Sequence, residues 1–252
     1  MKYKLTLAYD GTRYGGWQAQ TNTTAIQTLI EQSLKTALRQ NTPLIGASRT
    51  DAGVHALAQV AHFSFEKRID PLRLRASLNG LLPPDIRIRE IEPVDIDFHA
   101  RYSALSKEYH YHLHLDRVIN PFKRLYTTPV YHPVDIPFLT KAAQNFIGTH
   151  NFTSFTNEAH QDSTARHPIR TISRLDVVLE PGGVRLEFEG NGFLYKMVRN
   201  ITGTLLDITA GKISLSDLPK IFAEKDRKKA GKTAPAQGLF LIKIRYEKFN
   251  IN

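Results

Sequence analysis

The segment ASRTDAGVHA, at residues 47–56, places several side chains that can do chemistry close together. Arg49, Asp51 and His55 lie within it, between two apolar stretches. An ionised aspartate can act as a nucleophile or as a general base. Asp and Gly also form turns, and an isolated Asp-Ala-Gly is more typical of a structural turn. The rest of the chain must therefore decide what Asp51 does.

A serine protease-like triad of Ser48, His55 and Asp51 is disfavoured. No nucleophile-elbow pattern surrounds Ser48, and the members of such triads are brought together by the fold and not by short spacing.

Three histidines alternate on one predicted strand, at positions 110, 112 and 114. Imidazoles at that spacing can bind zinc. However, no carboxylate follows in phase before Asp116, and tyrosine and leucine occupy the other face. The polar face of a half-buried strand is the favoured interpretation, so no metal is expected.

The segment AGKT at residues 230–233 is similar to part of a phosphate-binding loop, but that loop requires a glycine where Asp226 stands. The basic run around it, Lys225 to Lys232, is interpreted as a solvated loop. No nucleotide cofactor is expected.

Composition narrows the class of protein. The 252 residues include 34 Lys and Arg against 24 Asp and Glu, a net charge of +10, which favours a polyanionic partner such as nucleic acid. The absence of cysteine excludes disulfides, thiolate nucleophiles and cysteine-based zinc sites. The first residues lack the apolar run of a signal peptide, and no stretch approaches the ~20 apolar residues of a membrane span. A cytoplasmic location is expected.

Hydrophobic periodicity and turn residues predict secondary structure along the whole chain. In the first half, Thr24 and Gln27 form a capping-box pattern, and Asp70-Pro71 starts a second helix. The elements predicted there are strands at 2–9, near 44, at 59–65 and at 86–92, with helices at 24–39 and 70–81. The second half repeats this order with strands at 105–115, 170–180, 184–190 and 239–247, and helices at 136–147, 194–209 and 216–224.

Each half is thus a β-α-β-β-α-β unit of the ferredoxin-like type. The predicted fold class is α+β, with two ferredoxin-like halves, residues 1–97 and 98–252, sharing one mainly antiparallel sheet. Fold alone does not determine function.

The segment RTDAGVHA closely resembles the signature of the TruA-type tRNA pseudouridine synthases. Other segments resemble the same family in the same order along nearly the whole chain. They are YDGTRYGGWQAQ (9–20), FHARYSALSKEYHY (98–111), NFTSF (151–155), FLYKMVRNITGTLL (193–206) and APAQGLFL (234–241).

The resemblance implies isomerisation of uridine to pseudouridine at positions 38, 39 and 40 of the tRNA anticodon stem-loop, without cofactor or metal. It implies a catalytic cleft between the two halves and a homodimer. By residue, it implies that Asp51 is catalytic and that Arg49, Tyr109 and Arg199 bind the substrate. The family usually has glycine where Ser48 stands, so a glycine-only backbone there would force the loop to shift.

Three routes for the carboxylate stay open: attack on C1′ of the ribose, removal of the 2′ proton to give a glycal, or addition to C6 of the base. Two other functions compete with this one: a non-catalytic RNA-binding module, and a metal-dependent nuclease using Asp10, Asp51 and the histidines.

Overall fold

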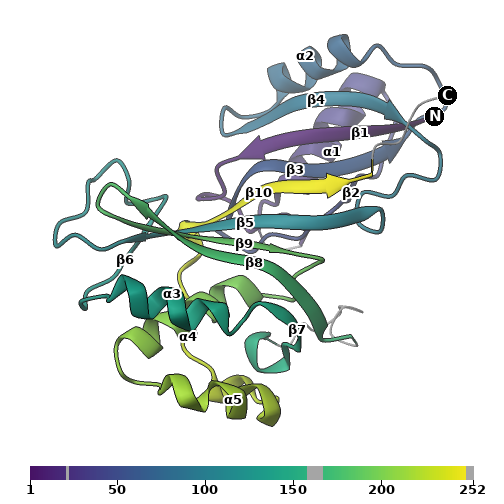
Figure 1. Cartoon of the computed structure of the whole chain (residues 1–252). Helices are drawn as coiled ribbons and strands as arrows, with labels where there is room; N and C mark the ends of the chain where they lie inside the picture. Colours follow the sequence, from purple (N-terminus) through teal and green to yellow (C-terminus); the bar gives the residue numbers. More distant parts are fainter. Residues whose placement is uncertain (21–22, 158–166, 248–252) are drawn as a thin grey trace. The chain divides into compact units, whose positions relative to one another are not determined.

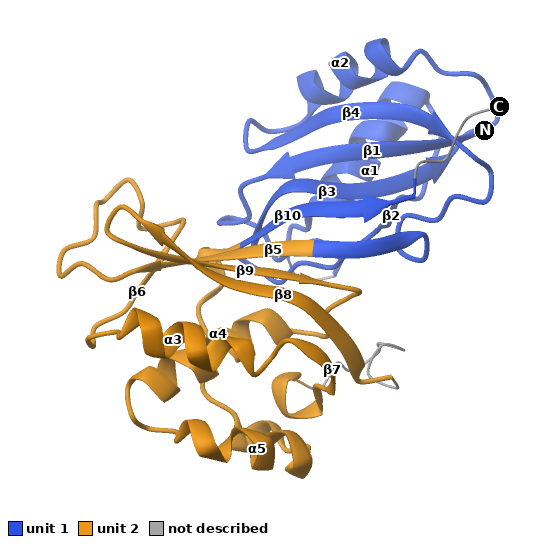
Figure 2. Ribbon diagram, in the orientation of Figure 1, with its two compact units in different colours: residues 1–107, 240–252 blue, residues 108–239 orange. Residues whose placement is uncertain are grey.

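The structure, a computed structural model, describes residues 1–20, 23–157 and 167–247 (Figure 1). The chain has a mixed α+β fold with one large, mostly antiparallel open sheet, as the sequence predicts. It divides into two compact units, residues 1–107 with 240–252 and residues 108–239, drawn in blue and orange in Figure 2. None of the helices in the described residues has the length and hydropathy that a bilayer crossing requires.

The first unit has the strand order β4-β1-β3-β10, with the short β2 on β3. Strand β1 pairs antiparallel with β3 and with β4, whereas β10 pairs parallel with β3. Alternate residues of β1 are buried, which explains its predicted apolar face. The strands are β1 (Lys2–Tyr9), β2 (Ile45–Gly46), β3 (His55–Ser64), β4 (Ile86–Val94) and β10 (Leu239–Tyr246).

Two helices belong to this unit, α1 (Ile26–Leu38) and α2 (Pro71–Leu81), and α2 packs against β4 and α1. Asp70 caps α2 as predicted, because its carboxylate accepts from the backbone N–H groups of Leu72 and Arg73.

The predicted capping box of α1 is wrong. The residue before the helix is Ala25, which has no side-chain cap. The Gln27 side chain instead donates to the Leu44 carbonyl at 2.9 Å and accepts from the Ala19 N–H at 3.1 Å. It therefore joins the helix to two loops.

The second unit has the strand order β5-β9-β8-β7, with the short β6 on β5. Strand β8 pairs antiparallel with β7 and β9, and β6 runs parallel to β5. The strands are β5 (Ala104–His114), which begins in the first unit, β6 (Thr128–Pro129), β7 (Gly148–Asn151), β8 (Ile169–Glu180) and β9 (Gly183–Gly190).

Helix α3 packs against β8 and α4, on which nine of the thirteen residues are buried. The helices are α3 (Ile136–Gln144), α4 (Met197–Thr209) and α5 (Leu218–Glu224), with short 3-10 turns η1 (Thr153–Phe155), η3 (Leu215–Asp217), η4 (Arg227–Lys229) and η5 (Ala236–Gly238). Helix α4 begins three residues later than predicted at Met197, because Lys196 before it has a left-handed backbone with φ +58°.

Candidate active site

Asp51 lies in the loop between β2 and β3, at residues 47–54, which we call the Asp51 loop. The Asp51 carbonyl accepts a hydrogen bond from the Val54 N–H at 3.1 Å, and Gly53 has φ +78°. These features make a tight turn, in which glycine supplies the positive φ. The side chain of Asp51 is partly exposed. Asp51 is thus a turn residue whether or not it is also catalytic.

The glycine-rich segment at 10–17 holds the Asp51 loop through backbone contacts. Trp17 N–H donates to the Thr50 carbonyl at 3.0 Å, and Gly53 N–H donates to the Tyr14 carbonyl at 3.4 Å. A Cβ at Gly16, where φ is +98°, would lie 2.5 Å from the Thr50 carbonyl oxygen. Only glycine therefore allows this close approach.

Side chains of the sheet support the same loop. The Tyr9 hydroxyl lies 2.8 Å from the hydroxyl of Thr50, a buried hydrogen bond. The Gln59 amide donates to the Ser48 carbonyl at 2.7 Å. The loop is therefore fixed to β1 and β3 as well as to the glycine-rich segment, which is the preorganisation that a reacting group needs.

Ser48 fits the loop without a shift. Within the described residues, the non-glycine positions with positive φ are Arg39, Lys196 and Lys225. Ser48 is not among them, so its backbone has a conformation that any residue can adopt. The expected difficulty with serine at this position is not found.

The remaining residues of the motif have different surroundings. Arg49 is exposed. His55 is 1% exposed, stacks on the Phe240 ring at 4.5 Å, and accepts at Nδ1 from the Gly11 N–H at 3.1 Å. The Asp10 carboxylate lies 3.1 Å from the same nitrogen. His55 therefore joins the glycine-rich segment to β3, which is a structural role.

Two other predicted site residues belong to the second unit. Tyr109 on β5 is 5% exposed and packs edge-to-face on Phe193, with ring centroids 5.2 Å apart. Arg199 on α4 donates from Nε to the Ala234 carbonyl at 2.8 Å, and Ala234 N–H donates back to the Arg199 carbonyl at 3.1 Å. These contacts tie the segment APAQG to α4.

The sequence analysis did not predict a buried hydrogen-bond network around Asn200, the residue next to Arg199. Asn200 is fully buried, and its side-chain Oδ1 accepts from the Arg227 guanidinium at 2.8 Å and from the Thr233 hydroxyl at 2.6 Å. Its side-chain Nδ2 donates to the Phe155 carbonyl and to Asn157 Oδ1, both at 2.9 Å. Arg227 therefore points inward, contrary to the solvated loop predicted for its basic run. The signal in the sequence was an asparagine at a position in phase with the buried face of a helix.

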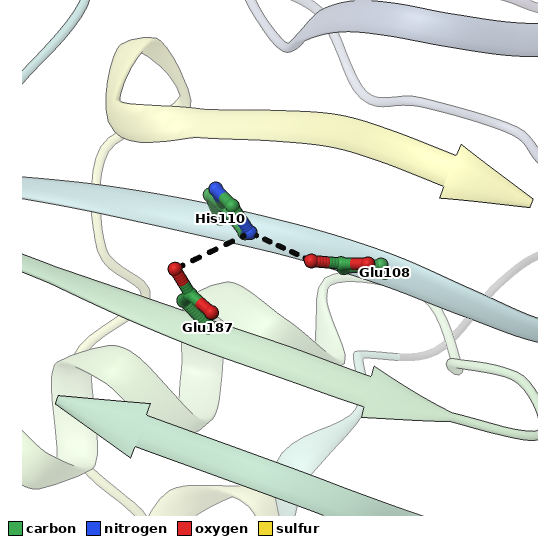
Figure 3. Close-up of side chains that lie close together, drawn as sticks. All are labelled: Glu108, His110 and Glu187. Carbon is green, nitrogen blue, oxygen red and sulfur yellow. Dashed lines mark hydrogen bonds and ion pairs between the residues drawn. The ribbon is translucent and has the colours of Figure 1, made fainter. Parts of the chain in front are cut away.

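A group of titratable side chains lies on β5 and β9 (Figure 3). His110 Nε2 is 3.0 Å from a Glu108 carboxylate oxygen and 3.8 Å from one of Glu187. Spacing alone would permit a metal ion. Arginines already neutralise the carboxylates, however, because Arg174 contacts both glutamates and Arg185 lies 2.6 Å from Glu187. A metal would have to displace these guanidinium groups, so the cluster is interpreted as an ion-pair network.

The pKa values agree with that interpretation. Burial alone raises the pKa of Glu187, but hydrogen bonds from Arg174 and Arg185 outweigh it and the net pKa is lowered. For Glu108, burial is likewise outweighed by His110 and Arg174, and its pKa is lowered. Both carboxylates are therefore ionised and paired.

The structure does not bring the three histidines to one point. His112 Nδ1 contacts Glu180 at 2.9 Å, and His114 Nε2 contacts the Val118 carbonyl at 3.0 Å. Each imidazole thus has its own partner, in agreement with a polar strand face.

Comparison with known proteins gives full-length matches. The family described as tRNA pseudouridine synthase matches residues 6–103 and 142–247. A relative named tRNA pseudouridine synthase A 1, from Protochlamydia amoebophila, is 55% identical, covering 98% of this chain and 97% of its own. Relatives named tRNA pseudouridine synthase A include those of Acetivibrio thermocellus, 43% identical over 96% of this chain and 98% of its own, and Limosilactobacillus reuteri, 40% identical over 97% and 96%.

The family match covers most of the chain, and it includes both the Asp51 loop and the glycine-rich segment that holds it. The chain therefore belongs to the tRNA pseudouridine synthase family and is an enzyme of that class.

Proposed function

We propose that this enzyme converts uridine to pseudouridine at positions 38, 39 and 40 of the tRNA anticodon stem-loop, with Asp51 as the catalytic carboxylate. The observation that carries the proposal is the Asp51 loop: its backbone is fixed by the glycine-rich segment and by two strands, while the Asp51 side chain is partly exposed. Relatives with up to 55% identity are named as tRNA pseudouridine synthase A.

The reaction suits a single carboxylate. The C1′–N1 bond breaks, the uracil turns, and a C1′–C5 bond forms; C5 loses its proton and N1 gains one. The exchange is redox neutral and hydrolyses nothing, so the substrate itself supplies all the atoms and electrons. An ionised aspartate can attack C1′, remove the 2′ proton or add to C6. We leave these three routes open.

The target uridine must leave its stack before C1′ becomes accessible. In this proposal, exposed Arg49 contacts the RNA backbone, Tyr109 stacks on the extruded base and Arg199 binds the substrate. Tyr109 is 5% exposed without RNA, so its contact requires that RNA binding uncover the ring. The site uses no metal in this proposal.

We also propose that the enzyme works in the cytoplasm, where its tRNA substrate is made, and as a homodimer with one tRNA across both subunits. The homodimer is what the family resemblance implies. Sedimentation of the pure protein alone and with tRNA measures the second: a dimer that binds one tRNA supports it, and a monomer that binds one tRNA contradicts it.

One assay tests the function. Unmodified tRNA transcript is incubated with the protein in EDTA and digested to nucleosides, and modified positions are mapped by primer extension after carbodiimide treatment. We expect pseudouridine at positions 38–40 of intact tRNA. Bound, intact tRNA without pseudouridine would support a non-catalytic RNA-binding module instead, and cleavage that EDTA abolishes would support a nuclease.

A further inference from the structure

An exposed tyrosine in the first unit has an unusually fixed ring. Tyr102, in the turn at residues 99–103 before β5, is 76% exposed. Its ring centroid lies 4.3 Å from that of His99, with an angle of 32° between the rings. The guanidinium of Arg101 is 5.8 Å from the Tyr102 centroid. An aromatic ring and a cation are therefore presented together at the surface.

Hydrogen bonds within the turn hold this ring in place. His99 Nδ1 accepts from the backbone N–H groups of Arg101 at 3.2 Å and Tyr102 at 3.3 Å. Ser103 closes the turn, since its hydroxyl accepts from His99 N–H at 3.0 Å and its N–H donates to the His99 carbonyl at 2.9 Å. The imidazole thus fixes both the backbone and one face of the exposed ring.

The turn is also anchored to the sheet below it. Ala100 N–H donates to His62 Nδ1 on β3 at 3.1 Å, and the Ala100 carbonyl accepts from the Tyr246 hydroxyl on β10 at 2.7 Å. His62 is 4% exposed, and its ring centroid lies 4.9 Å from that of His99. The surface ring therefore packs on the half-buried His99 ring, which in turn contacts the buried ring of His62.

Both supporting imidazoles are neutral at pH 7. Burial, together with the neighbouring His99 and Lys2, lowers the pKa of His62 to about 4. Burial and the charge of Lys2 also lower the pKa of His99. Neutral rings are required here, because both Nδ1 atoms accept hydrogen bonds. The positive charge beside Tyr102 is that of Arg101.

Three other exposed aromatic side chains differ from Tyr102. Phe122 is 86% and Tyr131 is 91% exposed, and within the described part of the chain neither ring has a ring contact or a cation over it. Tyr195, 40% exposed, has Lys196 4.9 Å from its ring centroid, but no second ring packs on it among the described residues. Single exposed apolar residues are ordinary and need no function. The fixed ring and adjacent cation, and not the exposure, distinguish Tyr102.

We propose that Tyr102 and Arg101 form a stacking platform for an unpaired base of the tRNA substrate, separate from the Asp51 loop. A flat ring that is already immobilised loses little conformational freedom when a base stacks on it. A guanidinium beside it can contact the adjoining phosphate, and the net charge of +10 attracts the polyanion. The inference depends on tRNA being the substrate, as proposed above.

The test is tRNA affinity across a salt series with three variants of the full-length chain. Because stacking on an aromatic ring contributes about 1–3 kcal/mol, Tyr102→Ala should raise the Kd for unmodified tRNA transcript about 5- to 150-fold. Tyr102→Phe, which keeps the ring, should stay within about 2-fold of wild type. Tyr131→Ala is the matched control for removing an exposed tyrosine and should leave Kd unchanged.

The salt dependence separates stacking from charge. Tyr102→Ala should leave the slope of log Kd against log salt unchanged, since no phosphate contact is lost, and kcat at saturating tRNA should also be unchanged. A Kd for Tyr102→Ala within about 2-fold of wild type would overturn the platform. A change in oligomeric state with unchanged tRNA affinity would also overturn it, because the surface would then bind protein. Pseudouridine formation by the wild type tests the proposed function independently of this Kd ratio.

Discussion

The Asp51 loop and the Glu108–His110–Glu187 cluster both gather groups that can do chemistry, yet they are built in opposite ways. In the loop, the glycine-rich segment and two strands fix the backbone around one partly exposed carboxylate. In the cluster, two arginines neutralise the carboxylates of two glutamates, and His110 lies 3.0 Å from one of them. The difference is between a loop whose backbone is held around a single carboxylate and a cluster whose carboxylates are held in ion pairs with arginines.

The largest expected effect is that of removing the carboxylate in the loop. Asp51→Ala should lower turnover by more than about 1,000-fold, because a group that acts in the reaction is lost, while tRNA affinity stays within about 3-fold. Steady-state kinetics and filter binding measure the two. Near wild-type turnover would show that another group is the catalyst.

The next effect concerns the backbone around that carboxylate. Gly16→Ala should lower kcat on the order of 100-fold, because its Cβ would meet the Thr50 carbonyl and displace the loop by a fraction of an ångström or more. Gly80→Ala in α2 is the matched control, since nothing lies within 4 Å of a Cβ there. Equal kcat values for the two variants would contradict the account, and thermal melting verifies that both fold.

Breaking the cluster should change stability and not turnover. Glu187→Gln removes the charge that pairs Arg174 and Arg185, and should lower the free energy of unfolding by about 1–3 kcal/mol. Its kcat should stay within about 2-fold of wild type, with or without EDTA. Loss of activity in EDTA, or in this variant with the fold intact, would assign chemistry to the cluster.

The smallest effect is a pH dependence of stability in the first unit. The pKa of His62 is about 4 in the folded chain and lies below its ordinary value, so the folded state binds fewer protons than the unfolded state between about pH 6.5 and 4. Stability should therefore fall as pH is lowered through that range. His62→Asn keeps an acceptor for Ala100 but does not titrate, so urea unfolding should show a weaker pH dependence. Parallel profiles would contradict this.

The sequence predicted most of the fold because its signals are local. Asp70 and Pro71 start α2 as expected, and the alternation in β1 gives its buried face. The predicted bounds were wrong where contacts between residues far apart in the sequence determine where an element begins. Strand β3 begins at His55, earlier than predicted, because His55 and Ala56 pair with Phe240 and Leu241 of β10.

In the candidate site, too, the local features could be predicted from the sequence and the contacts between distant residues could not. Asp51 was singled out because its motif is continuous in the sequence, but the contacts that hold its loop were not predicted, since they depend on Gly16 and Tyr9. The pairing of Glu187 with Arg174 was also invisible beforehand, because Arg174 comes from the neighbouring strand β8, whereas Arg185 lies on β9 with Glu187. The sequence gives no information about such a pair until the register is known.

The catalytic role of Asp51 is tested most directly by a single-turnover reaction in EDTA, with excess protein and tRNA carrying tritium at C5 of its uridines. Pseudouridine formation releases the C5 hydrogen to water. Wild type and Glu187→Gln should release tritium at similar rates, and Asp51→Asn should bind the same tRNA and release none. Release by Asp51→Asn at the wild-type rate, or none by the wild type, would contradict the account.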